Sequence, residues 1–149
     1  MARRSPTNVL RQMASIRALQ EYAAAANAAA AGRRLRTSTS DAEQASRMVR
    51  GAEDAWHRAH EAASLDLGTL LAWSREVRAK DNVLTLAEAD RGHARRRCET
   101  ALAASDRAAA FKTTADDQVR RGQNADARRL DEMSAAEALA LHAMRKIRA

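Results

Sequence analysis

Apolar and small side chains recur in alternating steps of three and four residues through the middle of the chain. Such spacing sets one stripe along a helix, and it is the pattern with which two helices pair in a left-handed coiled coil. The pattern predicts a long helix over about residues 6–63. Its stripe is Ala42, Ala45, Val49, Ala52, Trp56, Ala59 and Ala63.

This pattern stops at about residues 64–69, where Ser-Leu-Asp-Leu-Gly-Thr offers a helix-stopping glycine and side chains that cap helices. Beyond the stop, no cluster of helix breakers occurs, so we predict a second helix over about 69–147. Its stripe is Leu70, Trp73, Val77, Leu84, Ala87, Ala94, Cys98 and Ala101. The prediction is an all-α single domain, 1–149, folded as an antiparallel coiled-coil hairpin.

Two local signals refine the first helix. Ser5-Pro6 is a start signal, because serine caps helices and proline loses nothing at the first helical position. The stretch 32–41 begins with a glycine, contains a Thr-Ser-Thr-Ser run and ends near a capping-box pattern from Ser40 to Glu43, so we expect either a kink or a break there. In the second helix, Lys80, Arg91 and Lys112 fall on the stripe, where polar residues weaken packing and fix register.

The two helices differ in length. Folding about residue 66 places Pro6 roughly opposite residue 126 and leaves the last ~20 residues of the second helix without an internal partner. Those residues still form an apolar face flanked by basic side chains, which predicts a protein partner, with self-association or packing on the first helix after a register shift as alternatives. The face consists of Leu130, Met133, Ala140, Leu141, Met144 and Ile147.

Composition supports a narrow helical core. The hydrophobic content of 46% is mostly alanine, with 38 Ala against 13 Leu, 5 Val and 2 Ile. Alanine is the best helix former, and strand-forming side chains are scarce, so composition favours helices over a sheet. The net charge of +7 favours anionic partners. Because Cys98 is the single cysteine and no apolar run reaches the length of a membrane span, we expect a cytoplasmic protein.

No residue pattern indicates catalysis, and we expect neither an enzyme nor a metal or cofactor. His57, His60 and Glu61 share a helical face but lack the zincin order and a third ligand. Cys98 follows three arginines, yet consecutive residues on a helix point in different directions, so we expect Cys98 to be a small core residue.

Basic runs at Arg33-Arg34-Leu35-Arg36 and Arg95-Arg96-Arg97 offer phosphate contacts, but no nucleic-acid-binding motif accompanies them and aromatic residues for base stacking are scarce. We therefore expect a solvated charged face and no nucleic-acid partner. A basic nucleic-acid-associated protein and a purely structural coiled-coil oligomer remain the two alternative functions.

The C-terminal run Arg129-Leu130-Asp131, followed by Met133, Glu137 and Ala143-Met144-Arg145-Lys146, resembles the end of flagellar type III export proteins of the FliJ family. Overall length and a hairpin near mid-chain agree with that family. The resemblance implies a two-helix stalk that inserts its terminal end into the ring of the export ATPase. The residues implied in that contact are Arg129, Leu130, Met133, Glu137, Met144, Arg145 and Lys146.

The resemblance also implies a second contact, with the cytoplasmic domain of the membrane-embedded export gate. In the family, an apolar stripe just after the hairpin is thought to make it, and Trp73, Val77 and Leu84 occupy the matching places, although Lys80 stands where a small apolar residue is expected. The family is associated with export chaperones as well. The implied location is cytoplasmic, at the inner face of the cell membrane through the apparatus, whether that apparatus builds a flagellum or a related injection system.

Overall fold

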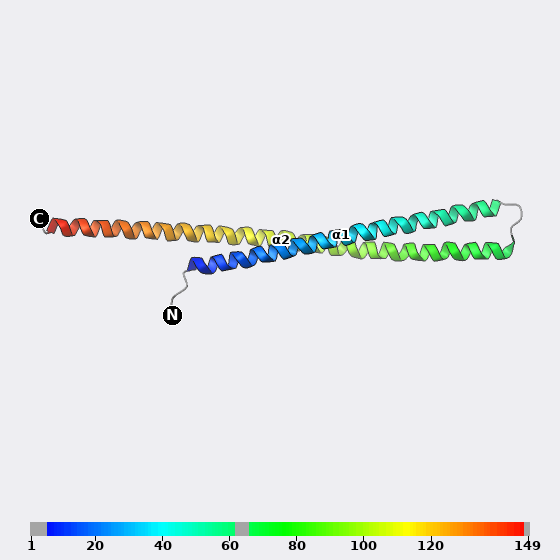
Figure 1. Ribbon diagram of the computed structural model, residues 1–149, viewed down its shortest axis with the longest axis horizontal. Coiled ribbons are helices and arrows are strands. Elements are labelled where there is room, and N and C mark those ends of the chain that lie inside the picture. The colour runs from blue at the N-terminus through cyan, green and yellow to red at the C-terminus, as the bar shows by residue number, and fades with distance from the viewer. Residues whose placement is uncertain (1–5, 62–65, 148–149) are drawn as a thin grey trace. The chain divides into compact units, whose positions relative to one another are not determined.

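The computed structural model describes residues 6–61 and 66–147, except for the side chains of residues 6, 143 and 145–147. The described residues form two helices, α1 (Pro6–Glu61) and α2 (Leu67–Ile147), and no strand (Figure 1). The helices run antiparallel and contain 56 and 81 residues, which confirms an all-α hairpin with a longer second helix. The predicted helix end at residue 63, with Ala63 of the stripe, falls outside the described residues.

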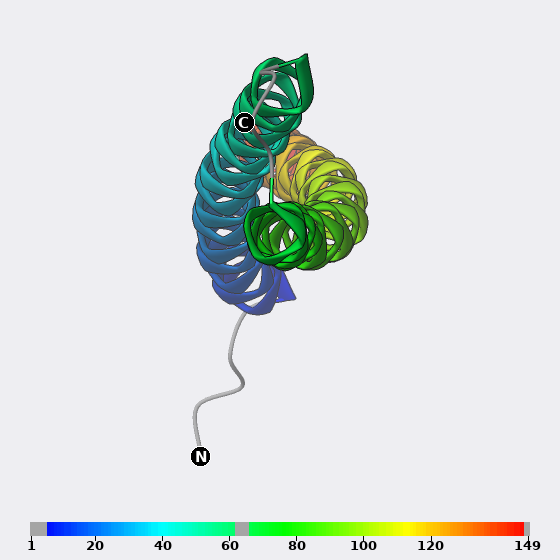
Figure 2. The ribbon, with the colours of Figure 1, turned by 90° about the vertical axis from the view of Figure 1, so that its right-hand side faces the viewer.

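Contacts between the helices divide the chain into two units. One combines Met1–Ala23 with Ser105–Ala149, and the other is Ala24–Ala104. In the second unit, the last turns of α1 lie beside the first turns of α2 (Figure 2). The described residues of each unit are treated below by themselves.

The core of the Ala24–Ala104 unit is a seam of small side chains. Its buried members are Ala28, Ala42, Ala45, Val49, Ala52 and Cys98, while Leu70, Trp73, Val77, Leu84, Ala87, Ala94 and Ala101 are half-buried. The stripes of both helices are thus the faces that pack together, as the three–four spacing predicted. Because a buried alanine removes little apolar area from water, the seam derives its stability from many small contributions along a long contact.

Helix α1 is unbroken through residues 32–41, which excludes a break, one of the two alternatives for this stretch. The hydroxyl of Thr37 donates to the carbonyl oxygen of Arg33, and the hydroxyls of Ser38 and Thr39 donate to that of Leu35. These side chains therefore bond back to the preceding turn of a continuing helix instead of capping a new one. Ser40 lies inside α1, where no helix start exists for a capping box.

Two of the three polar seam residues lie where the pattern put them. Lys80 and Lys112 are half-buried, whereas Arg91 is exposed and the neighbouring Gly92 takes the inward position. The placement of Arg91 is thus a correction: its long charged side chain keeps its hydration outside the seam. Lys80 pairs with a residue of its own helix, Glu76, at 2.7 Å between Nζ and Oε1.

Gly51 offers a test of the helical stability of α1. A Cβ added at Gly51 would meet no atom within 4 Å, so alanine fits without strain and should raise the free energy of unfolding by roughly 1 kcal/mol through helix propensity. Urea denaturation of Gly51→Ala measures the gain. Gly122→Ala is the matched comparison, because its Cβ would lie 3.1 Å from Leu10 Cδ1 and should give a smaller gain. A loss of stability in Gly51→Ala would contradict a continuous, exposed helix there.

Candidate functional site

In the unit formed by the N- and C-terminal segments, α1 begins beside Asp126 of α2. The buried Thr7 hydroxyl donates a hydrogen bond to the Asp126 carboxylate. One turn earlier on α2, Gly122 allows close approach, since a Cβ there would lie 3.1 Å from Leu10 Cδ1 and 3.7 Å from Thr7 Oγ1. The sequence placed Pro6 opposite residue 126, and these contacts confirm that register.

Two further contacts hold the same pair of helices. Lys112 Nζ lies 3.1 Å from Glu21 Oε2, and the Arg17 guanidinium sits over the Phe111 ring, 5.1 Å from its centroid. Both pairs are partly exposed, where an ion pair or cation–π contact contributes about 1 kcal/mol or less. They therefore position the helices more than they stabilise them.

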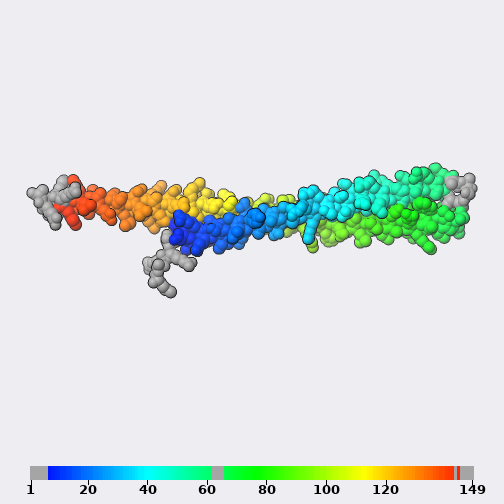
Figure 3. Space-filling view, in the orientation of Figure 1, coloured from blue at the N-terminus to red at the C-terminus, as the bar shows by residue number. Residues whose placement is uncertain are grey.

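Beyond Asp126, α2 has no covering helix. Every described side chain from residue 127 to the end of α2 is exposed, including Leu130 at 66%, Met133 at 61% and Met144 at 65%. In the space-filling view, the orange and red end of α2 continues past the blue start of α1 (Figure 3). We call residues 127–147 the C-terminal extension. The predicted overhang is confirmed.

The extension continues the apolar stripe on the same helical face. Covered positions of α2 follow steps of three and four as far as Val119, Gly122 and Asp126, and Leu130 and Met133 follow at the next steps of four and three. At 3.6 residues per turn, these positions lie on one side of the helix. The stripe of the extension is therefore the uncovered continuation of the face that contacts α1.

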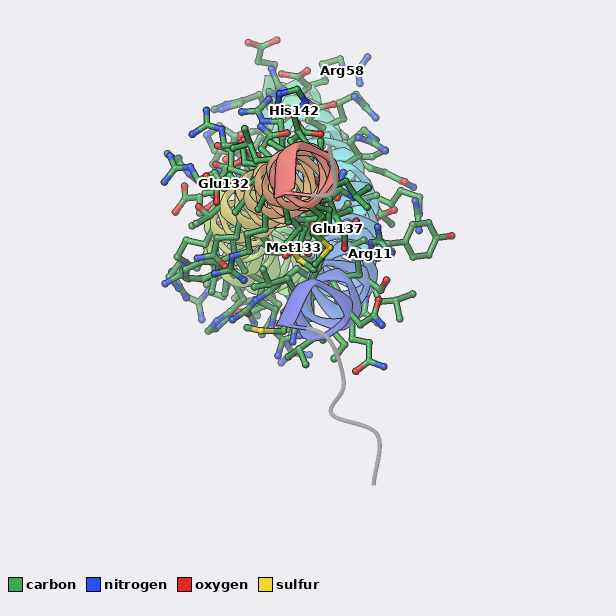
Figure 4. The ribbon with its side chains drawn as sticks, turned by 90° about the vertical axis from the view of Figure 1, so that its left-hand side faces the viewer. Arg11, Arg58, Glu132, Met133, Glu137 and His142 are labelled. Carbon is green, nitrogen blue, oxygen red and sulfur yellow. The ribbon has the colours of Figure 1, made fainter. Side chains whose placement is uncertain are left out.

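Figure 4 looks along α2 from its C-terminal end. Met133 and Glu137 lie on the side of the extension that faces the start of α1, while Glu132 and His142 point elsewhere (Figure 4). The resemblance to the FliJ family placed Met133 and Glu137 in one contact, and they do share one face. Arg129 is exposed too, whereas the side chains of Arg145 and Lys146 lie outside the described ones.

No family model, curated protein or solved structure matches this chain. Membership of the FliJ family therefore stays a prediction from the C-terminal residues.

Sequence reasoning missed a second exposed apolar stripe in this unit. Val9, Met13 and Ile16 of α1 are exposed by 44%, 47% and 55%. Their spacing of four and three was a visible signal for one helical face. They point away from the seam that contacts α2, which is lined on α1 by Thr7, Leu10, Ala14 and Glu21.

The first turn of α2 is capped by Asp66. Its Oδ1 accepts a hydrogen bond of 2.7 Å from the Thr69 backbone N–H, and the Leu70 N–H donates to the Asp66 carbonyl at 3.2 Å. Gly68, expected to stop a helix, lies inside α2 without a positive φ, and a Cβ there would stand 3.1 Å from Asp66 Oδ1. This is a correction: the capping carboxylate starts the helix two residues before the expected position 69.

The Asp66 cap predicts how the stability of the protein depends on pH. The backbone hydrogen bond from Thr69 lowers the pKa of Asp66, so its stabilisation is complete above the unfolded value of roughly 3.9 and is lost as pH falls through the lower folded value. Asp66→Asn keeps a capping oxygen without the titration. The Tm of the wild type should therefore fall relative to that of Asp66→Asn on acidification from about pH 6 to pH 2. Parallel curves for the two proteins would contradict the cap.

The predicted gate residues Trp73, Val77 and Leu84 are half-buried on the seam of the Ala24–Ala104 unit. Val77 lines a groove with Trp56, Ser74 and Arg78. Nearer the hairpin, Leu67 and Leu71 expose 73% and 52% of their surface. The exposed apolar side chains at this end are thus leucines that the sequence pattern did not single out.

His57 and His60 pack against Trp56. The His60 ring stacks on the indole at a centroid distance of 5.4 Å and an interplanar angle of 4°, and the His57 ring meets it edge-on at 5.0 Å. Within residues 6–61 and 66–147, no three His, Cys, Asp or Glu side chains gather into a metal-binding group. None of the described helices is long and apolar enough to cross a membrane.

Tertiary structure brings the two basic runs together. Arg34 of α1 and Arg97 of α2 line one open groove of about 720 Å³, along with His93 and Asp90. Alanines of both helices also line it, and among the described residues neither Arg34 nor Arg97 forms an ion pair. The groove is basic but not uniformly so, because Asp90 also lines it.

Proposed function

We propose that this chain is a non-enzymatic stalk that couples the ATPase ring of a flagellar type III protein export apparatus to its export gate. The observation that supports the proposal most directly is the C-terminal extension, which exposes Leu130, Met133 and Met144 on a helix without an internal partner. A helix with an exposed apolar stripe is a common ligand for a groove in another protein. The C-terminal likeness to the FliJ family supports the export ATPase as that protein.

The dimensions of the extension suit insertion into a ring. Twenty-one helical residues, 127–147, rise about 30 Å along the axis, comparable with the diameter of a small domain. A single helix is also narrower than the paired helices behind it, so it can reach further into a central opening. In this proposal, Arg129 and Glu137 contact polar groups of the ring, and Arg145 and Lys146 are assigned the same role from the sequence.

The gate contact is proposed at the hairpin end, through Trp73, Val77 and Leu84. Because these side chains are half-buried, a partner would meet only their exposed edges. The exposed Leu67 and Leu71 extend the available apolar surface toward the hairpin. The protein would then lie in the cytoplasm and meet the membrane only through the gate. An association with export chaperones is part of the same proposal, without assigned residues.

Affinity capture on the purified export ATPase and on the gate's cytoplasmic domain tests both contacts. A chain ending at Asp126 should fail to bind the ATPase yet still bind the gate domain, because it keeps all contacts of α1 with α2. Trp73→Ala should show the reverse selectivity. Retention of the ATPase by the shortened chain would refute the role of the extension.

One observation favours a second function, binding to nucleic acid. Arg34 and Arg97 share a groove, and neither forms an ion pair with another described residue. Phosphate binding there would fall steeply with salt concentration. Duplex DNA titrated against the wild type and Arg34→Glu/Arg97→Glu at near-physiological salt decides it: no binding by the wild type removes this alternative.

A further inference from the structure

A continuous groove follows one side of the paired helices in the Ala24–Ala104 unit. The open groove of about 720 Å³ described above shares Arg34, Ser38 and Asp90 with a neighbouring hollow of about 660 Å³, so the two form one depression, here called the side groove. On α2, its lining positions recur in steps of three and four, which marks a single helical face. These positions are Val83, Leu86, Asp90, His93 and Arg97.

Like charges face each other across the side groove at two levels. Arg34 of α1 and Arg97 of α2 line the same stretch of it. Asp41 lies seven residues further along α1, and Asp90 lies seven residues back along α2. Because the helices run antiparallel, the two aspartates share a level just as the two arginines do, and both line the groove. At 1.5 Å per residue, the arginine level and the aspartate level are about 10 Å apart.

One heptad nearer the hairpin, the same positions carry apolar side chains. Met48 of α1 and Val83 of α2 are 45% and 50% exposed, and the neighbouring Leu86 of α2 is 68% exposed. The side groove therefore presents a basic, an acidic and an apolar level at successive heptad intervals. Each level is built by both helices, so none of them can be read from one helix alone.

The charged levels have no counter-charges of their own. Among the described residues, Arg34, Arg97, Asp41 and Asp90 form no ion pair. Two like charges on opposite sides of a groove repel each other, whereas one opposite charge placed between them attracts both. Alanines of both helices also line the groove, and small side chains at a contact let another helix approach closely.

We propose that the side groove holds a helix of a partner protein that carries an acidic, a basic and an apolar residue one heptad apart. Its acidic residue lies at the arginine level, its basic residue at the aspartate level, and its apolar residue between Met48 and Val83. A helix that packs beside two paired helices keeps their heptad period, so all three residues fall on one of its faces. The proposal uses no residue assigned to the ATPase or to the gate and stands without the export function.

The alternation of charge favours a helix over nucleic acid. A phosphate backbone is negative along its whole length, so it would be attracted at the arginine level and repelled at the aspartate level. A helix can carry a different charge at each level. A second copy of this chain is disfavoured as the occupant as well, because two copies repel each other through their net charge of +7.

A synthetic peptide tests the order of the three levels. It is an alanine- and glutamine-based helix with glutamate, lysine and leucine one heptad apart, labelled for fluorescence anisotropy and titrated with the full chain. We expect saturable binding. The control peptide has the glutamate and the lysine exchanged and should bind about tenfold more weakly or less, because each of its charges then meets like charges. Equal affinity for the two peptides, or binding of neither, would overturn the proposal.

Variants of the groove test where the peptide binds. Arg34→Glu/Arg97→Glu should weaken binding of the first peptide about tenfold or more and should bind a peptide with lysine at both charged positions instead. Arg36→Glu/Arg47→Glu is the matched control. It changes the net charge equally, at exposed positions that lie on the side of α1 away from Arg34, and should keep the wild-type affinity. Equal losses in the two variants would show attraction by net charge alone and would overturn the proposal.

The same proteins distinguish the other occupants. Binding of duplex DNA by the wild type, lost in Arg34→Glu/Arg97→Glu and not displaced by the peptide, would assign the groove to nucleic acid and overturn the proposal. Sedimentation equilibrium should give the monomer mass of 16.3 kDa for the wild type. A dimer that Arg34→Glu/Arg97→Glu abolishes would show that a second copy covers the groove, and it would overturn the proposal too.

Discussion

Replacing Leu130, Met133 and Met144 together with aspartate is expected to abolish binding to the export ATPase and stimulation of its activity. The three side chains lie on one stripe of an uncovered helix and are exposed by 61–66%. Burying three carboxylates in an apolar contact without partners costs several kcal/mol, enough to lower affinity by more than about 1,000-fold. Phosphate release by the ATPase, measured with increasing amounts of each chain, reports the loss.

The fold should survive these substitutions. None of the three side chains contacts the seam, so helicity by circular dichroism should remain nearly that of the wild type, apart from the small propensity cost of aspartate. The matched control is Leu139→Asp, which adds an aspartate at an exposed position off the stripe of the same helix and should retain stimulation. Full stimulation by the triple variant would exclude this face as the ATPase contact.

The second large effect is expected in the alanine seam. Ala45→Asp should lower the free energy of unfolding by about 3 kcal/mol or more, because Ala45 is only 4% exposed and its carboxylate would lose hydration without gaining a partner. Urea denaturation followed by circular dichroism measures the loss.

Gln44→Asp provides the comparison for that variant. Residue 44 is exposed and adjacent in the chain, so it reports the helix propensity and net charge of an added aspartate without its burial. Its loss should stay near 0.5 kcal/mol or below. Equal losses at the two positions would mean that the seam does not pack through Ala45.

The two helices and their apolar stripes could be predicted from the sequence, because both depend on patterns of neighbouring residues. The seam residues Ala42, Ala45, Val49 and Ala52 are buried as their spacing predicted, and the start of α1 at Pro6 agrees with its signal. Comparing the two arms of the hairpin predicted the uncovered extension, which the exposure of Leu130 and Met133 confirms.

The local predictions that were wrong concern residues whose side chains are compatible with two different local structures. Thr37, Ser38 and Thr39 carry hydroxyls that can cap a helix or bond to its preceding turn, and packing of the flanking alanines kept the helix continuous. Gly68 was expected to stop a helix, but the carboxylate of Asp66 stabilises one that passes through it. Arg91 has the sequence spacing of a stripe residue, but its charged side chain lies at the edge of the stripe and turns outward to water.

By itself, the sequence determined the secondary structure, the antiparallel pairing and the uncovered C-terminal stripe, since helix propensity and three–four spacing act within a few residues. Only the tertiary structure decided which distant residues meet. It joined Thr7 to Asp126, beyond which the described side chains of α2 are exposed, and it set Arg34 and Arg97 in one groove. These contacts depend on how closely the two backbones approach each other at small residues such as Gly122. The spacing of residues along one helix carries no information about that distance.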